Sequence, residues 1–214
     1  MKIKRIIDIS RRIYTGMAVW PGDDEVRITR TKTMKSGGDY NLSSMSMGVH
    51  TGTHADAPVH FVNDGISMPS VDLSRFIGFV KVFKLNSEKY ITADDLKGLP
   101  VNEGDIIFFR TSNSDLPESE EFYKDFVYLE VSAAEYLVQK KIKTIGIDYL
   151  SVGGYGVDSG PVVHRLLLSN SIGIIEGLCM KDVREGTYMF SGLPLCIEGG
   201  DGSPVRAVLM EIEE

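Results

Sequence analysis

The chain has 214 residues, of which 43% are hydrophobic and 25% are charged, as is ordinary for a globular domain. Its net charge of −7 and isoelectric point near 5.2 argue against nucleic-acid binding through overall positive charge. The sequence has no apolar run of about 18 residues, and its N-terminus lacks a signal peptide's apolar stretch, so we expect neither a membrane span nor secretion.

No internal repeat, low-complexity tract or linker divides the sequence, so we predict a single domain over residues 1–214. The two cysteines, Cys179 and Cys196, fit no metal or redox spacing. We expect both to remain thiols in a cytoplasmic protein, and a disulfide between them is the alternative.

In chain order, the first half of the sequence is rich in short strand signals. Alternating or continuous apolar residues predict strands over 3–9, 25–31, 43–50, 80–85 and 105–110. A short capped helix is expected over 92–96, and the acidic stretch 115–125 is interpreted as a solvated surface loop.

The second half adds two longer helices and three more strands. A helix over 132–141 is predicted from Ser132 as its cap and Glu135 as the partner in a capping box. A second helix is predicted over 159–169, with Pro161 in its first turn. Strands are expected over 144–148, 172–176 and 206–212, and together these elements predict an α/β fold rich in strands, with few helices.

Three of the four histidines lie within eleven residues, in the segment His50-Thr-Gly-Thr-His54-Ala-Asp56-Ala-Pro-Val-His60. Gly52 and Pro58 oppose a helix here. Upstream, the alternation over 44–50 is typical of a half-buried strand that ends at His50.

If Gly52 turns the chain and the residues after it are extended, His54, Asp56 and His60 share one side of the backbone. Two neutral imidazoles and a carboxylate make a three-ligand metal set that leaves room for water, as a catalytic site requires. The alternative is a turn of polar residues that hydrogen-bond to the backbone, which explains a lone histidine better than this cluster.

Three further polar residues lie in or beside apolar elements. His164 falls in the predicted helix 159–169, and Glu176 and Asp148 each end an apolar strand. A buried carboxylate needs a cation, a metal or several hydrogen bonds, but a strand-end acid can also reach solvent. Asp148 could instead orient a ligand or cap the next turn. Spacing alone does not connect these residues to the histidine cluster.

Two glycine-rich stretches, 153–160 and 199–202, lack the features of phosphate-binding loops. They do not end in Gly-Lys-Ser/Thr, and neither has the strand–glycine–helix context of a dinucleotide site. We interpret them as loops at the rim of a pocket and expect no nucleotide.

The segment from His50 to Phe61 resembles the signature H-x-G-T-H-x-D-x-P-x-H-F of the metal-dependent cyclase family, which includes bacterial kynurenine formamidases. The likeness extends over most of the chain, through Trp20-Pro-Gly-Asp, Gly-Ile-Asp148, His164-Arg-Leu-Leu-Leu, Ile-Ile-Glu176-Gly-Leu, Leu193-Pro-Leu and the stretch 200–207. One departure is Gly177, because the family often has asparagine after the ligating glutamate.

The resemblance implies a single strand-rich domain of the swivelling β/β/α type, commonly a homodimer. It implies a first metal held by His50, His54 and Asp56, and a second held by Asp56 with His164 and Glu176. His60 matches the family's catalytic histidine. Zinc is the usual metal, two ions per subunit are expected, and manganese is found in relatives.

The activity implied is hydrolysis of a small aromatic amide, foremost the arylformamidase reaction that converts N-formylkynurenine to kynurenine and formate in tryptophan catabolism. His60 would serve as general acid and base. Trp20, the only tryptophan, is expected either to line the aromatic pocket or to act as a core or interface anchor. The alternatives are hydrolysis of another amide such as isatin, and a non-catalytic protein that binds metal or a small ligand.

Overall fold

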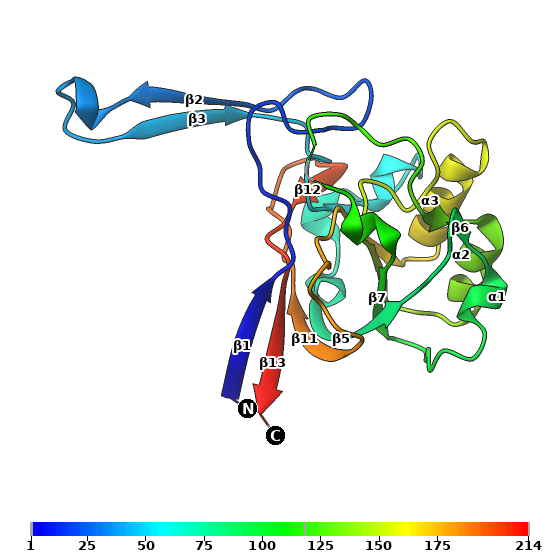
Figure 1. The fold of residues 1–214 in the computed structure, drawn as a ribbon. Helices are drawn as coiled ribbons and strands as arrows, with labels where there is room; N and C mark the ends of the chain where they lie inside the picture. Colours follow the sequence, from blue (N-terminus) through cyan, green and yellow to red (C-terminus); the bar gives the residue numbers. More distant parts are fainter. Residues whose placement is uncertain (1, 118, 214) are drawn as a thin grey trace.

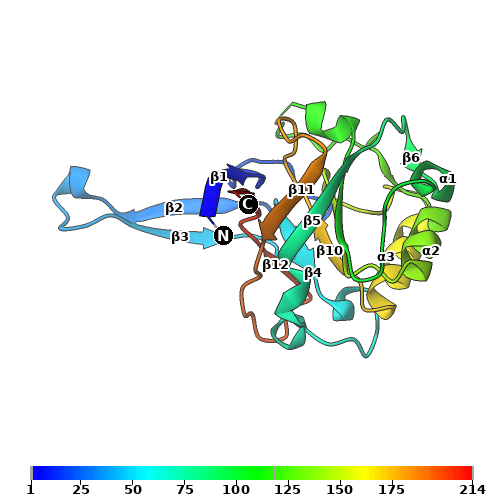
Figure 2. The same ribbon diagram turned by 90° about the horizontal axis from the view of Figure 1, so that it is seen from below.

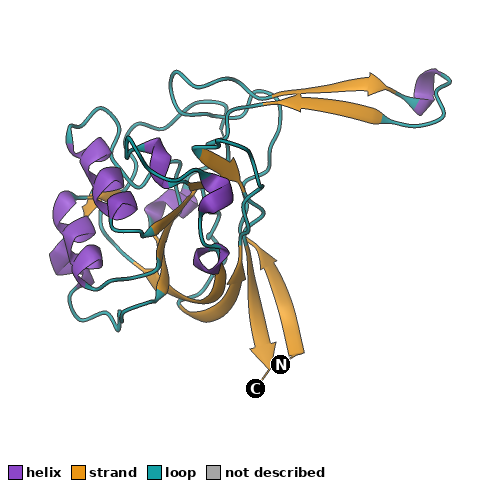
Figure 3. Ribbon diagram, turned by 180° about the vertical axis from the view of Figure 1, so that it is seen from behind, coloured by secondary structure: helices purple, strands orange, loops and turns teal. Residues whose placement is uncertain are grey.

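In the computed structural model, which describes residues 2–117 and 119–213, the described chain is built around one mixed sheet of nine strands. Figure 3 shows this sheet strongly curved, with the longer helices gathered on one side of the molecule. In sheet order the strands are Lys2–Asp8 (β1), Val208–Glu213 (β13), Gly186–Ser191 (β11), Ile77–Lys84 (β5), Ile106–Arg110 (β7), Thr144–Ile147 (β9), Gly173–Glu176 (β10), His54–Asp56 (β4) and Gly202–Pro204 (β12). The expected α/β fold, rich in strands, is confirmed.

The centre of the sheet is the parallel set β5, β7, β9 and β10. Because both faces of β7, β9 and β10 are covered, the sequences of these three strands are almost continuously apolar. In β7, Ile107 and Phe109 face the helices, and Ile106 and Phe108 face the second core on the opposite side.

Three α-helices are found in the described residues, and Figure 2 shows them together beside the sheet. They are Ala93–Leu96 (α1), Val131–Gln139 (α2) and Ser159–Ser169 (α3). None of the helices in the described part of the chain has both the length and the apolar character needed to cross a lipid bilayer.

All three predicted helices are present, but α2 spans Val131–Gln139 rather than 132–141, and its predicted cap is wrong. Helix α3 has the predicted bounds, and α1 carries a capping box between Thr92 and Asp95. Ser132 is wrong as the cap of α2, because Glu130 occupies that position and its carboxylate accepts a hydrogen bond of 2.8 Å from the Ser132 amide. The acidic side chain therefore lies at the helix N-terminus, where a negative charge is stabilised.

Strands Arg27–Lys32 (β2) and Leu42–Ser46 (β3) form a hairpin that projects from the body of the molecule, as Figure 1 shows. Every residue of both strands is exposed, so the predicted half-buried strand over 43–50 is wrong. Strand β3 ends at Ser46 and pairs only with β2, so neither of its faces meets a core. A further small sheet joins Tyr90–Ile91 (β6) and Tyr128–Leu129 (β8).

Candidate metal centre

Strand β4 places two of the predicted ligands next to β10. His54 and Asp56 are two residues apart and therefore point to the same face of the sheet. In the antiparallel ladder, His54 lies opposite Glu176, the last residue of β10. His54 Nε2 is 3.0 Å from Glu176 Oε2 and 3.6 Å from Asp56 Oδ1. All three side chains are buried.

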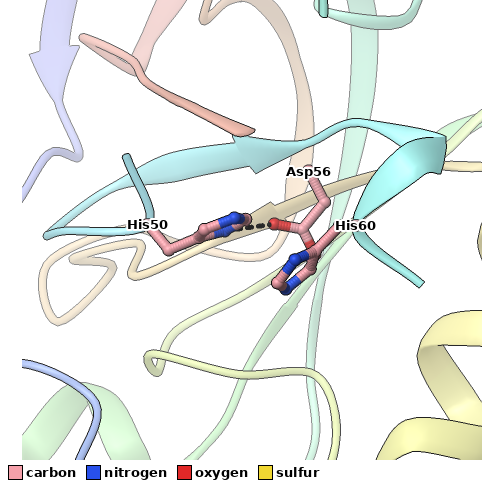
Figure 4. Close-up of side chains that lie close together, drawn as sticks. All are labelled: His50, Asp56 and His60. Carbon is pink, nitrogen blue, oxygen red and sulfur yellow. Dashed lines mark hydrogen bonds and ion pairs between the residues drawn. The ribbon is translucent and has the colours of Figure 1, made fainter. Parts of the chain in front are cut away.

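His50 reaches the same carboxylate from the turn that precedes β4. It does not end a strand as predicted but lies in a turn that continues to Gly52, whose φ of +69° favours glycine. His50 Nδ1 lies 3.0 Å from Asp56 Oδ1, a hydrogen-bonding contact drawn in Figure 4. Burial alone would lower the pKa of His50, but the hydrogen bond to Asp56 and the charge of that carboxylate outweigh it and raise the pKa to about 9.

His60 reaches the site by a different path from the one predicted. The chain is extended only over β4, and Pro58–His60 forms a 3-10 turn in which proline takes an early helical position. The turn nevertheless brings the His60 ring onto the His50 ring, with centroids 3.9 Å apart and an interplanar angle of 25°. Burial lowers the pKa of His60, which favours the neutral imidazole that a general base requires.

Glu176 is the hydrogen-bonding centre of the other half of the site. Its Oε1 accepts a 2.6 Å hydrogen bond from the Val152 amide and lies 3.2 Å from Nε2 of His164, on α3. Burial alone would raise the pKa of Glu176, but the contacts with His164 and His54 outweigh it and hold the pKa well below its usual range. Glu176 is therefore a buried anion, and the alternative of a strand end that reaches solvent is wrong.

The donor chemistry of this cluster suits a metal ion. His54 Nδ1 donates to the Gly52 carbonyl, and His164 Nδ1 donates to the Gly160 carbonyl. With Nδ1 engaged in this way, each Nε2 faces the Glu176 carboxylate, so either a proton or a metal cation must lie between the nitrogen and the carboxylate. Asp56 Oδ2 is buried with no hydrogen-bond partner, so this oxygen is available to a cation.

Two groups of donor atoms among the described residues lie within 4.8 Å of one another: His50 with Asp56 and His60, and His54 with Asp56 and Glu176. Asp56 belongs to both groups. The imidazoles divide differently from the family pattern, which pairs His50 with His54 and reserves His60 for catalysis. His50 and His54 contact Asp56 directly, and His164 joins the cluster through Glu176; the assignment of these residues to individual ions stays a prediction.

A pocket of about 420 Å³ opens over these side chains. Trp20 lines it and packs edge-to-face against Tyr155 and Phe122, so this residue both lines the pocket and anchors an aromatic cluster. Phe61 stacks on His164 with centroids 4.4 Å apart. The pocket therefore combines aromatic walls with the polar groups of the metal cluster.

Three other positions have roles that the sequence left open. Asp148 is a structural residue, because its buried carboxylate accepts hydrogen bonds from residues 111–114. Gly177 does not line the pocket; its φ is +70°, and a Cβ there would lie 2.1 Å from the Gly52 carbonyl oxygen. Asp201 lines the pocket, and its Oδ2 is 3.0 Å from His50 Nε2, a role that the sequence analysis missed. The sequence feature that could have indicated this role is the position of Asp201 between two glycines, in a loop predicted to lie at the rim of a pocket.

Comparisons with known proteins identify the family of this chain. A family model described as "Putative cyclase" matches residues 7–153. The kynurenine formamidase of Bacillus cereus is 32% identical over 212 residues, covering 99% of this chain and 100% of that protein.

Solved structures give the same picture. One described as a potential metal-dependent hydrolase with cyclase activity is 36% identical, with a TM-score of 0.85, and the match covers 98% of this chain and 99% of that one. Isatin hydrolase A from Labrenzia aggregata shares the fold, with a TM-score of 0.84 at 22% identity over 98% of this chain and 94% of that one. On the family model and the full-length relatives, the chain belongs to the cyclase family.

Proposed function

We propose that this protein is a zinc-dependent kynurenine formamidase, which hydrolyses N-formylkynurenine to kynurenine and formate. The observation that carries the proposal is Asp56, a buried carboxylate with one unpartnered oxygen, surrounded by imidazoles and a second buried acid beneath a pocket with aromatic walls. The full-length similarity to a kynurenine formamidase supports this substrate over other amides.

In the proposed site, His50, His54 and Asp56 would hold one ion, and Asp56, His164 and Glu176 would hold a second. The chemistry that zinc supplies in such a site is Lewis-acid activation of water at neutral pH. His60 carries the proton from water to the departing aryl nitrogen through Nε2, since its Nδ1 faces Asp201. Manganese is the alternative metal, since the same donor types bind it.

Substrate binding is proposed to use the aromatic walls of the pocket. Trp20 and Phe61 offer ring faces and edges to the flat aryl group of N-formylkynurenine. The volume of about 420 Å³ lies within the range of about 300 to 1,000 Å³ that is usual for small-molecule sites.

The test compares turnover of N-formylkynurenine and isatin by the purified protein, with metal content measured on the same sample. We expect kynurenine to form, activity to disappear on chelation, and zinc to restore it. A zinc-loaded protein that turns over isatin but not N-formylkynurenine would establish the alternative substrate. If the loaded protein hydrolyses no amide of a panel, it is a binding protein and the enzymatic proposal fails.

We also propose that the protein is a homodimer built through its projecting hairpin. Apolar side chains on the hairpin and its tip are between 42% and 58% exposed, which is unusual for an isolated arm in water; they are Ile28, Met34, Tyr40, Leu42 and Met45. A second copy of the chain would cover them in a two-fold arrangement.

A single domain over residues 1–214 and a cytoplasmic location complete the proposal. Both main core clusters pack on the same nine-stranded sheet, which supports one folding unit. No disulfide joins Cys179 to Cys196, as is typical of proteins in a reducing compartment.

A further inference from the structure

The carboxylate of Asp201 lies between two imidazoles of the site. Its Oδ2 is 3.0 Å from His50 Nε2 and 3.6 Å from His60 Nδ1. Because the two rings stack on each other, one carboxylate oxygen faces a nitrogen of each. His50 uses its other nitrogen, Nδ1, to reach Asp56.

The backbone holds Asp201 in this position. The next residue, Gly202, pairs with Asp56 in the ladder between β12 and β4, and the Ala57 amide donates a 2.8 Å hydrogen bond to the Asp201 carbonyl. A Cβ at Gly202 would lie 2.5 Å from His50 Cε1, so glycine at 202 lets the imidazole pack directly against this loop. The strand that carries Asp56 therefore also fixes the place of the Asp201 carboxylate.

We infer that Asp201 is a positioning residue that orients both His50 and His60. By accepting a hydrogen bond from His50 Nε2–H, it leaves Nδ1 as the nitrogen that would give up its proton and direct a lone pair at a metal ion beside Asp56. By facing His60 Nδ1, it leaves Nε2 of that ring for proton transfer. Carboxylates that accept a hydrogen bond from a ligating histidine fix its tautomer and ring orientation in this way. The inference rests on the proposed metal-dependent hydrolase and does not depend on which amide is hydrolysed.

The test uses Asp201→Asn and Asp201→Ala, with Glu198→Gln as the matched control. Glu198 is an exposed acid in the same loop, so its replacement removes the same charge without touching either imidazole. For both Asp201 variants we expect zinc affinity, measured by chelator competition, to fall about 10- to 100-fold. Under saturating zinc we expect kcat to fall while KM changes little. Glu198→Gln should match the wild type in both measurements.

A second measurement reports on the rings themselves. Because the chain has four histidines, long-range ¹⁵N–¹H spectra of the zinc-loaded protein can resolve each imidazole. We expect a protected Nε2–H signal from His50 in the wild type and in Glu198→Gln, and its loss in Asp201→Ala. Circular dichroism and thermal midpoints would verify that each variant folds.

The possible results separate this inference from the proposed function. A wild type that binds no zinc and hydrolyses no amide would refute the hydrolase. A wild type that binds zinc, with Asp201 variants of unchanged affinity, unchanged kcat and an unchanged His50 signal, would overturn the role of Asp201 alone.

Discussion

Zinc should stabilise this protein against heat, and the stabilisation should depend on Asp56. The Asp56 side chain is buried, with one oxygen lacking any hydrogen-bond partner, and the buried anion Glu176 lies nearby. These charges are brought together only by the fold, so a cation that bridges them binds the folded state far better than the unfolded chain.

The size of the effect follows from linkage between binding and folding. Free zinc at 100 times its dissociation constant adds about 2.7 kcal/mol to the free energy of unfolding. For a chain of this length, each kcal/mol raises the thermal midpoint by about 2 to 4 °C, so the expected rise is about 5 to 11 °C. Asp56→Asn replaces one carboxylate oxygen with an amide group that cannot bind a cation, and the rise should shrink to about 2 °C or less.

Scanning calorimetry of the metal-free wild type and of metal-free Asp56→Asn, each titrated with zinc, measures the thermal midpoints of the two proteins. Asp94→Asn is the control, because Asp94 is an exposed acid on α1 that pairs with Lys97, and the zinc-dependent rise of this variant should equal that of the wild type. The reasoning fails if zinc leaves the wild-type midpoint unchanged, or if Asp56→Asn gains as many degrees as the wild type does.

Three further predictions test the catalytic histidine, the buried acid and the hairpin. His60→Ala should lower kcat by about 10²- to 10⁴-fold and keep the full zinc-dependent midpoint rise, whereas loss of that rise would make His60 a ligand. Asp148→Ala should lower the free energy of unfolding, measured in urea, by about 3 to 5 kcal/mol, because the substitution leaves buried donors of residues 111–114 unpaired. A decrease under about 1 kcal/mol would contradict the structural role of Asp148. Leu42→Glu combined with Met45→Glu should halve the mass measured by light scattering, and an unchanged dimer would exclude the hairpin as the interface.

The sequence by itself determined the elements that local rules govern. Helix α3 begins and ends as predicted, because proline in its first turn and the apolar spacing act within one segment. The concentration of donors between His50 and His60 indicated a metal, and Gly52 turns the chain there as expected. Strands β7, β9 and β10 were recognisable as continuous apolar runs, since they are covered on both faces.

Only the tertiary structure decided which distant residues meet and which faces are covered. The pairing of β10 with β4 places Glu176 opposite His54, and the pairing of β12 with β4 brings Asp201 to His50. Strand β3 has the alternation of a half-buried strand but lies exposed on the hairpin, because burial depends on what packs against a strand. The physical reason is that periodicity records how side chains alternate along one segment, whereas sheet order and register join segments that are far apart in the chain.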